Sequence, residues 1–203
     1  MLEDARRLGF LGPGPVETHL DHAGGFAEAW RVAAQPVEGV AARAADLGSG
    51  AGLPGLPLAL ALTWCSWVLV EAGVRRAAFL RAAVERLGLT GRVEVAEERA
   101  EVLGRHPAHR GGYDLVVARS FAAPPVLAEC AAPLLRVGGR AIVSEPPGGS
   151  PARWPAAGLQ QLGLAAEMAV VAGGGAFQVL RMERECPARF PRRVGVPAKR
   201  PVF

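Results

Sequence analysis

Hydrophobic and polar positions fall into a repeating pattern from about residue 42 onward. Short runs rich in apolar residues, typical of strands buried on both faces, occupy 42–48, 66–72, 92–98, 113–121 and 140–145. The segments between them favour helices, which are expected from Pro54 onward and over 74–88, 99–104 and 124–139. Strands and helices that alternate in this way predict a doubly wound, mostly parallel α/β sheet.

The last two apolar runs are expected to pair with each other. Residues 164–172 and 176–184 flank the glycines at 173–175, a spacing that predicts a β-hairpin. This hairpin adds two strands to the five above and places an antiparallel strand at or near one edge of the sheet. The expected fold is therefore a seven-stranded, Rossmann-like sheet with an antiparallel C-terminal hairpin.

The chain before residue 42 has a weaker pattern. Residues 1–14 are expected to be irregular, and Pro15 is expected to open a helix because apolar residues recur at helical spacing over 16–30. The adjacent Gly24 and Gly25 are expected to interrupt it. The changes of pattern divide the chain into a helical N-terminal segment (1–41), a sheet domain (42–186) and a basic C-terminal tail (187–203).

Positive charge is concentrated at the C-terminus. The chain has a net charge of +4, and residues 181–203 carry seven basic side chains against two acidic ones. Such a tail suits an anionic partner such as RNA, although a tail that only improves solubility has the same composition. The basic residues expected to contact RNA phosphates are Arg192, Arg193, Lys199 and Arg200.

The cysteines and the N-terminal residues predict a cytoplasmic protein. The three cysteines are widely spaced without a CxxC pair, which argues against a disulfide framework or a zinc site. No signal-peptide pattern is visible at the N-terminus. The charge-free stretch at 47–70 starts as a glycine-rich loop and then divides into a helix and a strand, so no membrane span is expected.

The loop at 46–55, which reads DLGSGAGLPG, carries the candidate chemistry. It follows the first predicted strand and precedes a helix, which is where nucleotide cofactors bind in such sheets. The glycines form GxGxG rather than the GxGxxG of dinucleotide-binding proteins, and no GK[ST] follows as in a phosphate-binding loop. Asp46 suits the ammonium group of S-adenosylmethionine, whereas Glu71 suits the ribose hydroxyls of either cofactor class. An NAD-dependent oxidoreductase remains the weaker alternative.

Several segments taken together are more specific than the loop alone. They read DLGSGAGLPGLPLALA, VEAGVRRAAFLRAAVERLGL, ERAEVL, YDLVVARSFA and LLRVGG, followed by the tail PARFPRRVGVPAKRP. This combination resembles the glucose-inhibited division protein B family, which comprises guanine-N7 methyltransferases of small-subunit ribosomal RNA. The resemblance implies a class I S-adenosylmethionine-dependent methyltransferase that modifies N7 of a guanine in 16S ribosomal RNA. Its partner would be small ribosomal subunit RNA, and the enzyme is expected to be a monomer.

The resemblance also implies roles for individual positions. Gly48, Gly50 and Leu53 would line S-adenosylmethionine next to Asp46, Glu71 would hold its ribose, and Ala100 and Glu101 would flank its adenine. Arg119, at the end of the fourth strand, would lie where cofactor and target base meet, and is the candidate catalytic residue. For Arg119, an ion pair with Glu145 or Asp114 is the alternative.

Two departures from the family pattern affect the interpretation. The family has a tryptophan–asparagine pair near its N-terminus, whereas this chain contains no asparagine. The family also tends to have lysine–glycine after the fifth strand, where this chain has Glu145. These departures leave open a diverged paralogue that methylates a small molecule or another RNA, and a non-catalytic module that binds a cofactor or RNA.

Guanine N7 makes few chemical demands on an enzyme. Its lone pair attacks the sulfonium methyl without loss of a proton, so positioning suffices and no general base is required. The [DN]PP[YF] turn of exocyclic-amine methylation is absent after the fourth strand, which ends ARSF. Neither Cys65 nor Cys130 is placed to act as a nucleophile on pyrimidine C5. Two histidine pairs, at 19 and 22 and at 106 and 109, lack further ligands, so no metal is expected.

Overall fold

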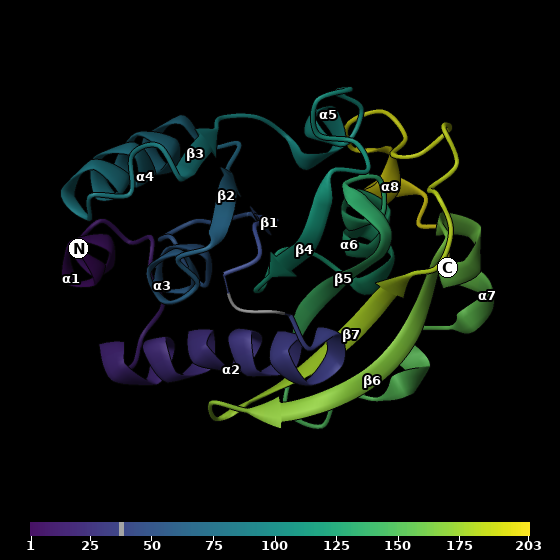
Figure 1. Cartoon of the computed structure of the whole chain (residues 1–203), viewed down its shortest axis with the longest axis horizontal. Helices are drawn as coiled ribbons and strands as arrows, with labels where there is room; N and C mark the ends of the chain where they lie inside the picture. The colour runs from purple at the N-terminus through teal and green to yellow at the C-terminus, as the bar shows by residue number, and fades with distance from the viewer. Residues whose placement is uncertain (37–38) are drawn as a thin grey trace.

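The computed structural model describes residues 1–36 and 39–203 and is organised around one seven-stranded sheet (Figure 1). The strand order is β3-β2-β1-β4-β5-β7-β6, in which β1 to β5 are parallel and β7 runs antiparallel to both of its neighbours. This confirms the predicted doubly wound sheet with a C-terminal hairpin. The strands are β1 Ala42–Leu47, β2 Cys65–Val70, β3 Val93–Ala96, β4 Tyr113–Ala118, β5 Leu135–Glu145, β6 Leu164–Ala172 and β7 Gly175–Met182.

Helices cover both faces of the sheet. The helices are α1 Leu2–Arg7, α2 Val16–Ala34, α3 Gly55–Ala61, α4 Val74–Arg86, α5 Ala100–Leu103, α6 Pro124–Ala131, α7 Ala156–Leu162 and α8 Val196–Lys199, with a 3-10 turn at Pro151–Arg153. Apolar residues of α2, α3 and α4 form one core cluster, and those of α5, α6 and α7 form another. The two clusters lie on opposite faces of the same strands, so the central strands are buried on both sides, as their continuous apolar runs predicted.

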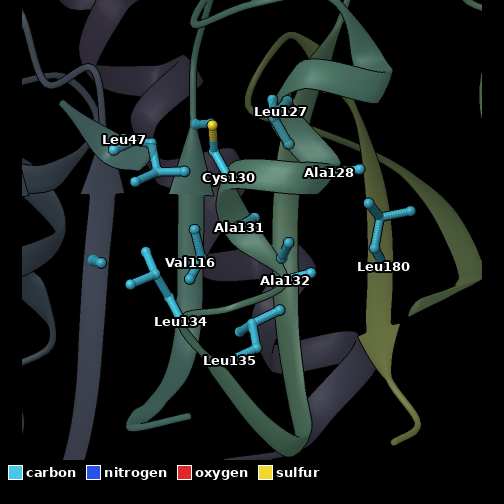
Figure 2. Packing of buried hydrophobic residues seen from close by; sticks show 14 of the residues in the cluster. Leu47, Val116, Leu127, Ala128, Cys130, Ala131, Ala132, Leu134, Leu135 and Leu180 are labelled. Atoms are coloured by element: carbon cyan, nitrogen blue, oxygen red, sulfur yellow. The ribbon is translucent and has the colours of Figure 1, made fainter. Parts of the chain in front are cut away.

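Helix α6 packs closely on the centre of the sheet because its inner face is made of small side chains. Ala128, Cys130 and Ala131 are fully buried; in Figure 2, Ala131 lies near Val116 of β4, Ala128 near Leu180 of β7, and Cys130 near Leu47 of β1. Small residues let the helix approach the strands, and the leucines around them fill the remaining space. Burial of each such leucine contributes about 1.5–3 kcal/mol to the stability of the fold.

The helix predicted over 124–139 ends at Ala131, and the prediction was wrong beyond that point. Pro133 cannot donate a helical hydrogen bond, and its ring would clash with the carbonyl of the preceding turn. The chain turns there, and β5 begins at Leu135, earlier than the strand predicted over 140–145. The pairing with β4 is irregular between Tyr113 and Leu115, which accommodates the glycine-containing segment before Arg140.

The N-terminal segment is more regular than predicted. Residues 2–7 form α1, and α2 continues without a break through Gly24 and Gly25. Gly25 is needed for packing, because a Cβ there would lie 2.5 Å from Cε2 of Phe177 and 2.7 Å from the carbonyl oxygen of Ala172. Helix α2 therefore lies directly against the hairpin β6–β7, beside it in Figure 1. Tertiary packing outweighs the helix penalty of the two glycines.

The charge-free stretch at 47–70 divides as predicted into a loop, helix α3 and strand β2. Helix α3 and strand β2 contribute Leu56, Trp67 and Leu69 to the core. Within the described parts of the chain, no helix has the length and apolarity needed to cross a membrane.

The two adjacent glycines of α2 provide a matched test of this packing. Gly25→Ala is expected to destabilise the protein by about 1–3 kcal/mol, because the added methyl group clashes with Phe177 and with backbone. Gly24 has open space around its Cβ position, so Gly24→Ala should stabilise by about 0.5–1 kcal/mol through helix propensity. Urea unfolding with unchanged m-values would measure both effects. Equal changes in the two variants would contradict the proposed contact.

Candidate active site

The candidate site lies where the order of the strands reverses. Strand β1 pairs in parallel with β2 on one side and with β4 on the other, and Leu47 is in register with both Val70 and Ala118. The loops that follow these three strands therefore leave the sheet at the same edge. In an open α/β sheet this is the crevice in which ligands bind.

The loop after β1 is shaped by glycines in the left-handed region. Gly48 and Gly50 have φ values of 69° and 55°, which are unfavourable for residues that carry a Cβ. A Cβ on Gly48 would also lie 2.7 Å from Cδ2 of Phe121, which comes from the loop after β4. The two loops can approach each other only because residue 48 is a glycine. They form the two sides of a cavity of about 260 Å³.

This first cavity brings together most of the residues predicted to bind a cofactor. Its walls include Gly48, Gly50, Glu71, Ala100 and Glu101. They come from the ends of β1 and β2 and from the start of α5, segments that are far apart in the sequence. Further residues on its wall are Val70, Ala72, Arg76, Glu98, Arg99, Ser120 and Phe121.

Glu71 fixes the shape of the first cavity. Its Oε2 accepts a hydrogen bond of 3.1 Å from the Gly50 amide, and its Oε1 accepts one of 2.7 Å from the Gly73 amide. Arg76 Nε lies 3.1 Å from Oε1 and balances the charge. A carboxylate has about four acceptor positions, so Glu71 retains capacity for a ligand hydroxyl.

Glu101 joins the cavity to the C-terminal tail. Its Oε1 accepts a hydrogen bond of 3.1 Å from the Gly195 amide, and Arg99 Nη2 lies 3.3 Å from the same oxygen. Burial favours the neutral carboxyl, but backbone hydrogen bonds, including the one from Gly195, and the contact with Arg99 outweigh it, so the pKa of Glu101 is lowered. Glu101 is therefore an anionic anchor for the tail as well as part of the cavity wall.

Asp46 lies beneath the glycine loop and not on the cavity wall. It is completely buried, and its Oδ2 accepts a hydrogen bond of 3.0 Å from the Gly55 amide at the start of α3. Its Oδ1 has no hydrogen-bond partner among the described residues. Burial raises the pKa of Asp46 to about 7, against the opposing effect of the Gly55 hydrogen bond. In this structure Asp46 holds the loop to the helix.

Leu53 also lies outside the first cavity. Its side chain is buried in a small cluster with Leu2 of α1 and Ala23 of α2. The structure thus gives the Leu53 side chain a packing role between the glycine loop and the N-terminal helices. Its predicted contact with a cofactor remains a prediction.

Arg119 lines a second cavity of about 430 Å³ that adjoins the first. Ser120 and Phe121 contribute to the walls of both cavities, so the second begins where the first ends. Arg119 forms no ion pair with Glu145 or Asp114; its Nη2 lies 2.8 Å from Nδ1 of His19 on α2. Partial burial lowers the pKa of the Arg119 guanidinium, and the charge of Asp46 opposes this effect. Arg119 is not on the wall of the first cavity, so its predicted place between cofactor and target base remains a prediction.

Glu145 also lines the second cavity and is held by two neighbours. Its Oε1 accepts a hydrogen bond of 2.8 Å from the indole nitrogen of Trp154, and Arg153 Nε lies 3.2 Å from Oε2. All three residues line this cavity. The 3-10 turn at Pro151–Arg153 therefore places a cation beside the acid that the sequence has after β5.

The basic tail folds against the domain. Arg192 forms a bidentate pair with Glu129 of α6, which is completely buried, with Nη2 2.6 Å from Oε2 and the Arg192 amide 2.8 Å from Oε1. This pair raises the pKa of Arg192. By contrast, Arg193, Lys199 and Arg200 are exposed. The four predicted RNA contacts therefore divide into one side chain in a buried ion pair and three on the surface.

Other candidates from the sequence lie in packed surroundings. Tyr113 is fully buried, and its hydroxyl is 2.5 Å from Nδ1 of His109. Cys65 and Cys130 are buried, and burial raises the pKa of both thiols, which makes them poor nucleophiles. Among the described residues, no group of three or more metal-ligating side chains comes together.

Sequence reasoning missed the partners of the candidate residues. Phe121, which bridges the two cavities, stood out only as a strand-end aromatic. Ser120 has a φ of 52°, an uncommon value for a residue with a side chain and one that often marks functional sites. His19 stood out only as half of a histidine pair, because nothing in the sequence indicates that α2 reaches the end of β4.

Comparisons with known proteins agree with this geometry. The family model described as rRNA small subunit methyltransferase G matches residues 30–144, which include the glycine loop, Glu71 and Arg119. A protein of that name from Rubrobacter xylanophilus is 43% identical over 181 residues, covering 80% of this chain and 66% of the relative. One from Prochlorococcus marinus is 41% identical over 179 residues, covering 79% of this chain and 68% of the relative.

The chain belongs to the rRNA small subunit methyltransferase G family. It spans about two thirds of the length of these relatives. The resemblance drawn from the sequence segments is confirmed, and with it the methyltransferase class. The match covers both loops that meet at Phe121.

Solved structures support the fold independently of close sequence similarity. A SAM-dependent methyltransferase from Aquifex aeolicus has a TM-score of 0.61 at 16% identity and covers 90% of this chain and 98% of that one. A putative O-methyltransferase from Klebsiella pneumoniae has a TM-score of 0.63 at 18% identity and covers 90% of this chain and 88% of that one. Similarities this remote in sequence establish the class I methyltransferase fold alone.

The buried carboxyl of Asp46 predicts an unusual pH dependence of stability. Its pKa of about 7 in the fold exceeds the ordinary value of 3.8, so the folded state binds this proton more tightly than the unfolded state. The contribution of Asp46 to the free energy of unfolding is therefore greatest below about pH 4. It falls as the pH rises to about 7 and is constant above that. Asp46→Asn should remove the decline and be more stable at pH 8, by at most about 4 kcal/mol. Chemical unfolding of both proteins at pH 4 and pH 8 measures the difference; parallel changes in the two would contradict the assignment.

The two adjacent arginines of the tail should behave differently. Arg192→Ala leaves the buried carboxylate of Glu129 without its ion pair and is expected to destabilise the protein by about 3 kcal/mol. Arg193→Ala removes an exposed side chain and should change stability by less than about 0.5 kcal/mol. Thermal and urea unfolding would measure both variants. Similar stabilities would show that the pair with Glu129 contributes little to folding.

Proposed function

We propose that this protein transfers a methyl group from S-adenosylmethionine to N7 of a guanine in 16S ribosomal RNA. The observation that carries the proposal is the pair of adjoining cavities that share Ser120 and Phe121. One cavity has the glycine loop and Glu71 on its wall, and the other has Arg119. A cofactor site next to an acceptor site is the arrangement that direct group transfer between two bound molecules requires.

The residues around the first cavity fit S-adenosylmethionine. Gly48 and Gly50 allow close approach of the backbone to a ligand, and a Cβ at Gly48 would clash with Phe121 on the wall of the same cavity. Glu71 has spare acceptor capacity for ribose hydroxyls, while Ala100 offers a small surface for a flat ring. Bound there, S-adenosylmethionine supplies an electrophilic methyl group on a sulfonium.

Orientation of the acceptor base is the main task left to the protein. Guanine N7 carries a free lone pair and loses no proton on methylation, so the residues of the second cavity need only hold the base in line. Phe121 lies between the cavities, where an aromatic ring can stack on a base. Arg119, with donors only, is suited to an acceptor atom of the nucleotide.

The surface beside the first cavity suits an anionic partner. Gly195 hydrogen-bonds to Glu101 on the cavity wall, so the exposed Arg193 is anchored close to the site. Lys199, the last residue of α8, and Arg200, which follows it, are also exposed. We infer that these three cations contact RNA phosphates, whereas Arg192 serves the fold.

Methyl transfer to small ribosomal subunits that lack N7 methylation tests the proposal. The wild-type protein with labelled S-adenosylmethionine should yield labelled 7-methylguanosine after digestion of the RNA. Arg119→Ala should lower kcat/KM by about 100-fold or more, while affinity for S-adenosylhomocysteine should change little because Arg119 lines the second cavity. Arg105→Ala, in an exposed residue outside both cavities, is the matched control and should retain activity.

The possible failures have different meanings. If no methyl group is transferred to RNA although S-adenosylhomocysteine still binds, the proposed acceptor is wrong. The protein would then be a methyltransferase core that acts on another substrate or on none. Methylation at a guanine atom other than N7 would contradict the proposed chemistry. Absence of S-adenosylhomocysteine binding would contradict the cofactor assignment itself.

A further inference from the structure

A side chain of helix α2, that of His19, contacts Arg119, which lines the second cavity. Nδ1 of His19 lies 2.8 Å from Nη2 of Arg119, although the two residues are 100 positions apart in the chain. His19 is 8% exposed, and Arg119 is half-buried. The contact therefore lies in a largely water-excluded place, where a hydrogen bond to a charged group is most effective.

The chemistry of the two groups fixes the protonation of His19. A guanidinium has donors only, so Nδ1 must be the acceptor and the proton must lie on Nε2. His19 is therefore a neutral imidazole in this contact. The remaining atoms of the pair, Nε2 of His19 and Nη1 of Arg119, are buried and have no partner among the described residues. Each residue of the pair therefore keeps an N–H donor that makes no hydrogen bond within the described residues.

A neutral partner leaves the positive charge of Arg119 available. Within the described parts of the chain, Arg119 forms no salt bridge, whereas Glu145 on the same cavity is paired with Arg153. A carboxylate in place of His19 would hold the guanidinium equally well but would neutralise it. The histidine thus holds Arg119, which lines the second cavity, without cancelling its charge.

Helix α2 is firmly held where it carries His19. One turn along, the ring of His22 packs 5.2 Å from that of Phe177, and Phe26 packs 4.6 Å from the same ring. The hairpin turn fits closely beneath, since a Cβ on Gly175 would lie 2.7 Å from His22. These contacts fix α2 against β7, so His19 approaches Arg119 from a rigid support.

We propose that His19 is a positioning residue that fixes the guanidinium of Arg119 for the RNA acceptor without neutralising it. The proposal rests on the proposed function of the second cavity. It assigns α2 a role in the reaction: the helix completes the acceptor site through Arg119. It also separates His19 from the cofactor, since His19 does not line the first cavity.

Three variants test the role of the acceptor atom. His19→Leu keeps an apolar volume but removes the acceptor, and should lower kcat/KM for ribosomal subunits by about 10- to 100-fold. His19→Asn restores an acceptor near the position of Nδ1 and should recover most of this loss. Thr18→Ala, at the exposed neighbouring position, is the matched control and should behave as wild type. Affinity for S-adenosylhomocysteine should stay within about twofold in all three.

A double variant distinguishes positioning from a general structural effect. If His19 acts through Arg119, His19→Leu should cause no further loss in an Arg119→Ala background. Additive losses, or wild-type activity of His19→Leu, would overturn the proposal. The same holds if His19→Asn is as impaired as His19→Leu.

A measurement without RNA separates this inference from the proposed function. In ¹⁵N spectra of the wild-type protein, His19 should be the neutral Nε2–H form, and the Arg119 side chain should be more mobile in His19→Leu than in wild type. A paired, neutral His19 in a protein that does not methylate RNA would contradict the proposed function but not the pairing. A His19 protonated on Nδ1 at neutral pH, or an Arg119 equally mobile in both proteins, would overturn the inference.

Discussion

The site depends on the parallel register of β1 with both of its neighbours. Because Leu47 is level with Val70 and with Ala118, three chain segments leave the sheet at the same edge and at the same height. The amides of Gly48 and Ser49 continue the ladder by donating to the carbonyl oxygen of Val70, at 2.9 Å and 3.1 Å. A shift of one residue in either pairing would move Glu71 or Arg119 to the other face of the sheet. The cavities exist because these two registers hold simultaneously.

Close approach around this edge has an electrostatic cost. The tight connection between the glycine loop and α3 places the carboxyl of Asp46 where no water reaches it, with one oxygen lacking a partner among the described residues. Such a group resists ionisation, and the charge of nearby Glu71 resists it further. The same loop needs glycine at position 48, because Phe121 occupies the space of its Cβ. Local strain and desolvation at the loop are thus balanced by packing elsewhere in the fold.

The sequence predicted the doubly wound sheet and part of the first cavity, because these follow from local patterns, but Asp46 and Leu53 lie outside that cavity. Alternating apolar runs predicted the strands, and the position of the glycine loop after β1 predicted where Gly48, Gly50 and Glu71 would meet. It was insufficient where distant segments dock. The path of α2 depends on Gly25 fitting against Phe177, and the separation of Arg192 from Arg193 depends on a buried Glu129 on another helix. The hydrophobic pattern of a sequence does not indicate which distant segments touch, so the contact of Arg119 with His19 was visible only in the structure.

The charges around the two cavities favour different ligands. In the first cavity, Glu71 is matched by Arg76 and Glu101 by Arg99, whereas Glu98 has no ion pair among the described residues, so the wall keeps a small negative balance. In the second, Glu145 is matched by Arg153, and Arg119 is held by a neutral histidine. The balance there is positive by one charge, while the tail exposes its own cations beside the first cavity, where Gly195 hydrogen-bonds to Glu101. Under the proposed function, the uncompensated charge of the second cavity would attract an anionic chain, and S-adenosylmethionine, which carries a net positive charge, would suit the first cavity. The division of the acids among ion pairs therefore agrees with the proposed assignment of one cavity to the cofactor and the other to the RNA base.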